Sequence, residues 1–219
     1  MTRVFLILSV ILNLFLGIFF VRSQVPPERL YTVAQIIDGD TFIIDNKQSI
    51  RLINVNAPEE GLCGYQQAKD ELTSLLAGKQ VKLVGDTNDI HNRLLALVYL
   101  PDGTLINEAI LRSGWARFTS NKTVESTRLQ KAGVDSKALK IGIFSPLCAQ
   151  NTNPKNPNCS IKGNVKDGNK TYFFQGCGNY SNVELALDEG DQWFCSEAEA
   201  VRAGFVKAQN CYSKMFAPK

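Results

Sequence analysis

Two carboxylates flank a glycine inside an apolar, β-branched stretch of the sequence, "IIDGDTFIID" at residues 36–45. They belong to Asp38 and Asp40. An ionised carboxylate in a strand loses water and gains no packing, so a compensating partner is expected nearby. An Asp-Gly pair is also a common hairpin turn, which needs no chemistry. The stretch therefore has two interpretations, a plain turn or an acidic site.

A second group of polar residues follows in "RLINVNAPEE", residues 51–60. In a small barrel the two stretches are neighbours, so Asp40, the side-chain oxygen of Asn56 and a backbone carbonyl near Ala57 can converge. Oxygen atoms of this kind are the ligands that Ca²⁺ prefers. Glu59 follows the proline and is expected one water molecule away from such a cation.

Arg51 and Arg93 are the cations expected to act beside this metal. Guanidinium groups bind phosphate oxygens through two parallel hydrogen bonds. A metal and two arginines can neutralise the charge that builds on a five-coordinate phosphorus, while Glu59 orients or deprotonates the attacking water. Each residue taken alone also fits a solvated surface position. The prediction of phosphodiester chemistry therefore depends on their joint order.

The elements that must position these side chains follow from apolar spacing and from turn residues. The sequence predicts strands at 31–38, 41–46, 49–57, 80–86 and 93–100, and helices at 65–79, 105–114 and 124–141. This order is typical of a five-stranded α+β barrel with a helix between its third and fourth strands, the OB-fold. The apolar residues of 49–57 do not alternate regularly, so this strand is expected to be bulged or curved.

An uncharged apolar run at residues 4–21 begins the chain. It is longer than the apolar core of most signal peptides and just long enough for a tilted membrane span. Residues 1–23 are therefore expected to be a cleaved signal peptide or a retained anchor. Both alternatives place the rest of the chain outside the cytoplasm, either secreted or anchored to the membrane through residues 4–21.

The six cysteines indicate disulfides, because an even number in an exported chain is typical of cross-linked domains. A barrel domain is expected at 24–148 and a linker at 149–157, within "AQNTNPKNPN". Residues 158–219 are expected to form a small second module whose aromatic residues make its core. With 24 cations and 21 acids, the overall charge does not indicate a nucleic-acid partner, so such a partner has to be argued from the site.

The order of these motifs is similar to that of a known family. "IIDGDTFII…IRLINVNAPE…DIHNRLLALVYLPDGTLINEAILRSGWAR…GIFS" resembles the staphylococcal nuclease (thermonuclease) family along residues 31–145. The resemblance implies an OB-fold, calcium-dependent nuclease that cuts DNA and RNA and leaves 3′-phosphates. We expect it to be an endonuclease that acts as a monomer on single-stranded or denatured DNA and RNA, although the sequence does not distinguish internal from terminal cleavage. It implies metal ligands at Asp40, Asn56 and the Ala57 carbonyl. The catalytic residues that it implies are Arg51, Arg93 and the general base Glu59.

Two positions depart from the family pattern. Asn56 stands where the family's best-known member has an aspartate, and an amide oxygen brings no charge, so weaker calcium binding or loss of the metal is expected. In "DIHNR", Ile90 and His91 stand where the family often has a lysine and a tyrosine that contact phosphate. His91 can replace the second of these contacts; simple exposure is the alternative.

The C-terminal stretch resembles the sunset domain, a small cysteine-containing module appended to exported nucleases of this family. Its end also looks like an Ada-type zinc-binding fold, but Ala208 stands at one expected cysteine position. In an exported chain, the resemblance favours disulfides Cys177–Cys211 and Cys159–Cys195, which leaves Cys63 and Cys148 as the last pair. The six cysteines allow 15 pairings, so other connectivities remain open.

Two further functions compete with the enzyme. One is a non-catalytic OB module with a decayed metal site, which binds nucleic acid or protein without cleavage. The other is an exported zinc-binding adaptor, which depends on the C-terminal module alone. Arg51, Glu59 and Arg93 occur together, and a decayed site has no reason to keep all three, so the hydrolase is favoured.

Overall fold

The computed structural model describes residues 29–211. The chain divides into two units, Met1–Leu30 and Tyr31–Lys219, and all elements described below belong to the second. The segment expected as a signal peptide or anchor, residues 4–21, lies outside the described residues. Within residues 29–211, no helix combines the length and the apolar content that a membrane span requires.

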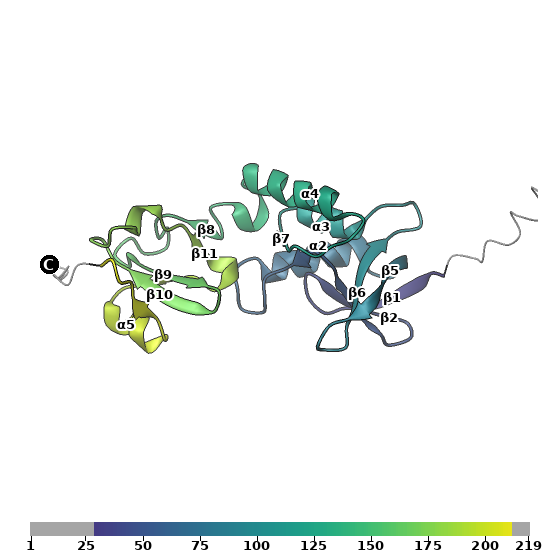
Figure 1. Cartoon of the computed structure of the whole chain (residues 1–219), viewed down its shortest axis with the longest axis horizontal. Helices are drawn as coiled ribbons and strands as arrows, with labels where there is room; N and C mark the ends of the chain where they lie inside the picture. The colour runs from purple at the N-terminus through teal and green to yellow at the C-terminus, as the bar shows by residue number, and fades with distance from the viewer. Residues whose placement is uncertain (1–28, 212–219) are drawn as a thin grey trace, which may run out of the picture. The chain divides into compact units, whose positions relative to one another are not determined.

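Five strands close into a barrel in the order β1-β2-β3-β6-β5 (Figure 1). The strands are β1 (Tyr31–Ile36), β2 (Thr41–Ile44), β3 (Ser49–Leu52), β5 (Gln80–Asn88) and β6 (Leu94–Tyr99). All neighbouring strands run antiparallel except β3 and β6, which are parallel. Helix α2 (Tyr65–Leu76) lies between β3 and β5 along the chain. The predicted five-stranded OB barrel with helices is confirmed.

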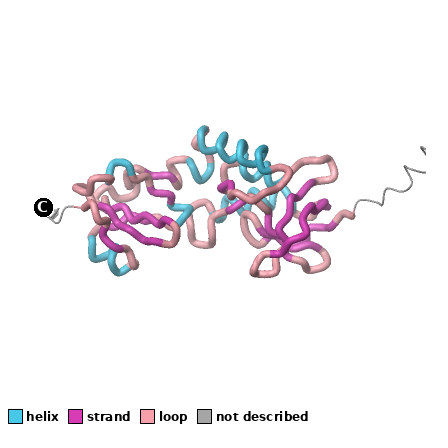
Figure 2. Tube along the Cα trace, viewed as in Figure 1, coloured by secondary structure: helices cyan, strands magenta, loops and turns pink. Residues whose placement is uncertain are grey.

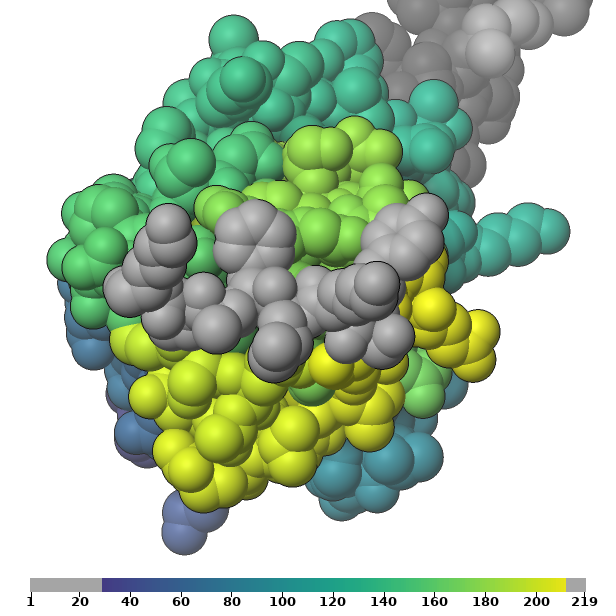
Figure 3. All heavy atoms as spheres, turned by 90° about the vertical axis from the view of Figure 1, so that its left-hand side faces the viewer, coloured from purple at the N-terminus to yellow at the C-terminus, as the bar shows by residue number. Residues whose placement is uncertain are grey.

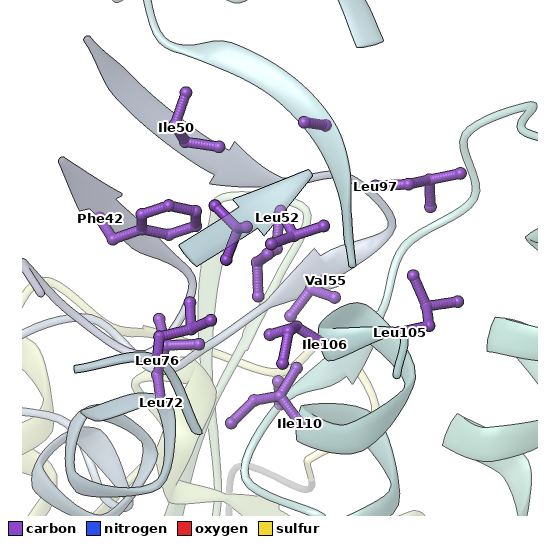
Figure 4. Close-up of a cluster of buried hydrophobic side chains, with 14 of the residues drawn as sticks. Phe42, Ile50, Leu52, Val55, Leu72, Leu76, Leu97, Leu105, Ile106 and Ile110 are labelled. Carbon is purple, nitrogen blue, oxygen red and sulfur yellow. The ribbon is translucent and has the colours of Figure 1, made fainter. Parts of the chain in front are cut away.

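The main hydrophobic core lies between the barrel strands and the helices that pack against them (Figure 4). Ala68, Leu72 and Leu76 of α2 are buried at four-residue spacing, which places them on one face of the helix. Gly78 follows this helix with φ of 67°, a conformation that glycine adopts without strain at a helix end.

The strand predicted at 49–57 is interrupted, which corrects the expected single bulged or curved strand. β3 ends at Leu52, and β4 (Val55–Asn56) pairs instead with β7 (Arg117–Phe118). Asn54 has φ of 64° between them, and an asparagine tolerates this left-handed conformation. Its side-chain amide donates to the carbonyls of Thr119 and Asn121, both at 2.8 Å. The turn carries Asn56 out of the barrel wall and toward β7.

All three helices of the barrel domain, α2 included, are shorter than predicted. α3 (Ile106–Arg112) and α4 (Ser126–Ala138) lie together beside the barrel, as the cyan segments in Figure 2 show. A short turn of helix, η1 (Gly142–Phe144), follows α4 and leads to Cys148.

The C-terminal module has its own sheet and its own small core. Its sheet has the order β12-β9-β10-β13, with a separate pair β8–β11. The elements are β8 (Ala149–Gln150), β9 (Ile161–Lys166), β10 (Asn169–Phe173), η2 (Tyr180–Asn182), β11 (Leu185–Ala186), η3 (Leu187–Glu189), β12 (Gln192–Phe194), α5 (Glu197–Arg202) and β13 (Val206–Lys207). Figure 3 views the molecule from the side of this module, whose yellow and light-green residues face the viewer.

Aromatic residues fill the core of this module, as the sequence predicts. Tyr172, Phe174, Phe194 and Phe205 are buried, and the last two rings meet edge to face at 5.1 Å. The disulfides are Cys63–Cys148, Cys159–Cys195 and Cys177–Cys211, the expected pairs. Covalent links of this kind stabilise modules whose cores are too small to hold the fold alone.

Candidate active site

The "DGD" stretch forms a tight loop between β1 and β2 that points Asp40 inward. The Asp40 N–H donates to Asp38 Oδ1 at 3.0 Å, which closes the loop locally. Gly39 lies against helix α2: a Cβ atom at this position would come within 2.5 Å of the Ala68 Cβ and 2.7 Å of the Ala57 Cβ. Close packing against the helix therefore requires the glycine, and the loop is more than a solvent-exposed hairpin.

Asp40 is 2% exposed and accepts three hydrogen bonds. Its Oδ1 accepts from Thr41 Oγ1 at 2.9 Å and from Arg51 Nη1 at 2.5 Å, and its Oδ2 accepts from the Ala57 N–H at 2.9 Å. Burial raises the pKa of Asp40 to about 6, against the opposing effect of the Arg51 charge. The carboxylate is thus costly to bury and is compensated by a cation, as its sequence context predicts.

The guanidinium of Arg51 joins Asp40 to Asn56. While Nη1 bonds Asp40, Nη2 donates to Asn56 Oδ1 at 2.8 Å. A carboxylate oxygen and an amide oxygen therefore converge on one positively charged group. The structure brings together Asp40, Arg51, Asn56 and Ala57, four of the site residues predicted from sequence.

Arg93 is held by a separate acid at the start of β6. Its Nε and backbone N–H donate to the two oxygens of Asp89 at 2.7 and 3.0 Å. The hydrogen bond from the Arg93 N–H outweighs desolvation and, with further help from the Arg93 side chain, lowers the pKa of Asp89 to about 2. Asp89 therefore fixes both the backbone and the side chain of Arg93.

Arg93 directly precedes β6, the strand that neighbours the strand of Arg51. Leu95 is the register partner of Arg51 in the parallel pair β3–β6. Residues two positions apart in an extended chain point to the same face, so Arg93, one residue before the strand, is expected on the face of Leu95 and hence of Arg51. Two guanidinium groups on one face can hold a single phosphate from two sides.

Glu59 and His91 are both exposed, on different loops. The Glu59 carbonyl accepts the Leu62 N–H at 3.0 Å, which closes a turn just after β4. Within residues 29–211, the Glu59 side chain has neither a hydrogen bond nor an ion pair, so its carboxylate is open to water. His91 donates its backbone N–H to Asp89 at 2.9 Å, at the tip of the β5–β6 hairpin.

Two supporting residues of this site have no role in the sequence interpretation. Thr41 donates to Asp40, and Asp89 holds Arg93. The i, i+4 spacing of Asp89 and Arg93 is a sequence signal that points to their pairing, whereas Thr41 is an ordinary strand residue in sequence.

The oxygen atoms around Asp40 suit a hard cation. No cluster of three or more His, Cys, Asp or Glu side chains suited to a metal exists among residues 29–211. Calcium also accepts amide and backbone oxygens, and Asp40 and Asn56 already place two oxygens on one cationic group. The donor set therefore fits Ca²⁺ in chemical type, with one carboxylate and one neutral amide.

Comparisons with known proteins point to one family. Residues 49–146 match the family model described as "Staphylococcal nuclease homologue". The chain is 31% identical over 131 residues to a thermonuclease of Staphylococcus hyicus, covering 54% of this chain and 77% of that protein. It is 30% identical over 142 residues to a protein of Haemophilus influenzae named an uncharacterized endonuclease, covering 63% and 79%.

A third relative covers a shorter region. A protein of Escherichia coli O157:H7 named an uncharacterized endonuclease is 37% identical over 87 residues. This alignment covers 38% of the chain and 57% of the relative, so the chain matches little more than half of that protein's length.

Proposed function

Since this chain belongs to the staphylococcal nuclease family, we propose that it is a calcium-dependent endonuclease that hydrolyses phosphodiester bonds of single-stranded DNA and RNA. One observation carries the proposal: the buried carboxylate of Asp40, the amide of Asn56 and the guanidinium of Arg51 form a single cluster. By the register of β3 and β6, Arg93 is expected on the same face of the sheet. Cations gathered next to an oxygen-rich site favour a phosphate substrate.

Asp40, Asn56 and the carbonyl of Ala57 are the groups proposed to hold the calcium ion. When bound, the ion supplies positive charge that polarises a phosphate oxygen. Since Asn56 is neutral, the chain brings one negative charge fewer than a site with two carboxylates. We therefore expect the chain to bind calcium weakly and to need a high concentration of it.

Arg51 and Arg93 are proposed to bind the non-bridging oxygens of the scissile phosphate. Both are paired with carboxylates, and a phosphate offers the same two-point geometry as a carboxylate. As charge builds on the phosphorus in the transition state, each guanidinium strengthens its contact and lowers the barrier. His91, exposed on the β5–β6 hairpin, is proposed to contact a neighbouring phosphate.

Glu59 is proposed as the general base, because its carboxylate is open to water on the loop after β4. The water oxygen bonds to phosphorus and its proton passes to Glu59. The bond from phosphorus to the 5′-oxygen breaks, and that oxygen takes a proton from solvent. The products are a 3′-phosphate and a free 5′-hydroxyl.

We further propose that the chain acts outside the cytoplasm as a monomer. Three disulfides support an oxidising compartment. The apolar residues 4–21 agree with export or anchoring. Fractionation of cells that make the full chain tests this proposal: the protein is expected in the membrane or in the medium, and recovery in the cytoplasm would contradict export. Light scattering of the purified chain tests the monomer.

Hydrolysis of denatured DNA by the purified full chain, with calcium titrated against a chelator, tests the function. Glu59→Gln is expected to abolish cleavage, whereas Glu60→Gln, the adjacent exposed acid, is the matched control and is expected to retain it. Cleavage that survives either chelation or Glu59→Gln would contradict the proposed mechanism. If the folded chain binds single-stranded DNA but does not cleave it at any calcium concentration, the non-catalytic OB module would be favoured.

A further inference from the structure

The three-residue turn η3 of the C-terminal module forms hydrogen bonds with the barrel domain at two places. At the first place, Arg117 of β7 donates two hydrogen bonds to Asp188, from Nε to Oδ2 at 2.7 Å and from Nη2 to Oδ1 at 3.0 Å. The Asp188 side chain is 2% exposed. A two-point bond between arginine and a buried carboxylate is a strong and directional interaction.

The second contact is made by the backbone of Leu187, which forms two hydrogen bonds with the barrel domain. Its N–H donates to the Cys148 carbonyl at 2.9 Å, and its carbonyl accepts the Cys63 N–H at 3.4 Å. Cys63 and Cys148 are themselves joined by a disulfide. Leu187 therefore bonds to both halves of the covalent link.

Both contacts lie next to residues of the proposed active site. Arg117 lies directly opposite Asn56 in the β4–β7 pair. Cys63 lies four residues after Glu59, and the turn between Glu59 and Leu62 connects them. The turn η3 is therefore hydrogen-bonded to β7, which pairs with the strand of Asn56, and to Cys63, which follows the loop of Glu59.

The contact between Arg117 and Asp188 depends on the charges of both side chains. Burial works against the charged guanidinium of Arg117, but the hydrogen bond and the negative charge of Asp188 raise its pKa overall. Glu189 adds a second carboxylate at 3.4 Å from Arg117 Nε. Loss of the Asp188 charge would leave a largely buried arginine without its main partner, a costly state that favours movement of β7.

We propose that Asp188 and Leu187 are positioning residues for phosphodiester hydrolysis, so that the C-terminal module sets the geometry between Asn56 and Glu59. This inference rests on the proposed nuclease function. Catalysis depends steeply on geometry, and a displacement of about 1 Å far from the reacting atoms can lower a rate by about a hundredfold. The module thereby acquires a role in catalysis without touching the substrate.

A purely structural role for Asp188 is the alternative, and a second acid in the same module is the matched control. Glu197 accepts a hydrogen bond from Tyr172 at 2.5 Å and pairs with Lys207 at 2.7 Å, entirely within the module. Glu197→Gln therefore weakens the module without altering the contact with β7.

The experiment compares full-length Asp188→Asn, Asp188→Glu and Glu197→Gln in steady-state cleavage of single-stranded DNA and in thermal melting. Asp188→Asn is expected to lower kcat about ten- to a hundredfold with little change in KM, and Asp188→Glu to recover part of the loss. Glu197→Gln is expected to lower Tm but not kcat. An unchanged kcat in Asp188→Asn, or an equal loss in Glu197→Gln, would overturn the inference.

Amide NMR spectra separate this inference from the proposed function. In Asp188→Asn, the signals of Asn56 and Glu59 are expected to shift, while Glu197→Gln leaves them in place. An inactive wild-type chain would refute the proposed function, and the spectra would still decide whether η3 positions the site. If Asp188→Asn does not fold, Arg117→Lys replaces it, because lysine keeps the charge but not the two-point bond. Unshifted signals in the folded variant would overturn the positioning role.

Discussion

Arg51 Nη1 lies 2.5 Å from Asp40 Oδ1, so the arginine proposed to bind phosphate also neutralises the buried carboxylate proposed to bind metal. One guanidinium thus has two tasks, one in the folded chain and one in catalysis. A cation that binds Asp40 would neutralise its carboxylate in place of Arg51, so that the guanidinium of Arg51 could then bind a phosphate.

Arg51→Gln therefore combines a loss of activity with a loss of stability. We expect kcat to fall by about 10²–10³-fold, the usual effect of removing one transition-state donor. The free energy of unfolding should fall by about 1–3 kcal/mol, because Asp40 keeps only its bonds from Thr41 and Ala57. Cleavage assays and urea unfolding measure the two effects. Arg112→Gln, which removes a half-exposed ion pair with Glu108, is the control and should change neither by much.

Asn56→Asp should strengthen calcium binding. The substitution adds a negative charge to the proposed ligand set, and the charge of the ligands tunes calcium affinity. We expect the calcium dissociation constant to fall about tenfold, or about 1.4 kcal/mol, in isothermal titration. An unchanged affinity would mean that Asn56 does not contact the ion.

The pairing of Asp89 with Arg93 predicts an unusual acid titration. Hydrogen bonds from Arg93 lower the pKa of Asp89 from 3.8 to about 2. Since the folded pKa lies below the unfolded one, the loop is stabilised above the unfolded pKa, and this stabilisation disappears as the pH falls from 3.8 to about 2. NMR titration of the Asp89 carboxyl carbon should show its midpoint near the lower value. In Arg93→Gln the midpoint should rise; an unaltered midpoint would show that the backbone alone holds Asp89.

Gly39→Ala should destabilise the barrel. The new methyl group would meet the Cβ atoms of Ala57 and Ala68 at 2.7 and 2.5 Å, so α2 or the loop must move. We expect a loss of about 1–3 kcal/mol in urea unfolding, together with lower activity, since Asp40 is the next residue. Gly178→Ala, whose methyl group would meet no described atom closer than 3.8 Å, should be tolerated. Equal stability of the two variants would contradict the packing argument.

Local patterns in the sequence determined much of this protein. Alternating and helical apolar spacing predicts the five strands and α2, because burial of apolar faces decides these elements residue by residue. The motif order around Asp40, Arg51, Glu59 and Arg93 indicates phosphate chemistry. The even number of cysteines indicates the covalent links. Each of these features depends on residue types and short spacings, which can be read directly.

Only the tertiary structure decided how the groups meet. The break between β3 and β4 depends on Asn54 bonding to carbonyls more than sixty residues later, a partner that local patterns do not specify. The shared hydrogen bonds of Arg51 arise because the start of β2 and the ends of β3 and β4 meet at the site. The bond between Arg117 and Asp188 joins residues 71 positions apart. Long-range partners are chosen by the packing of whole elements, so the sequence alone does not specify these pairs.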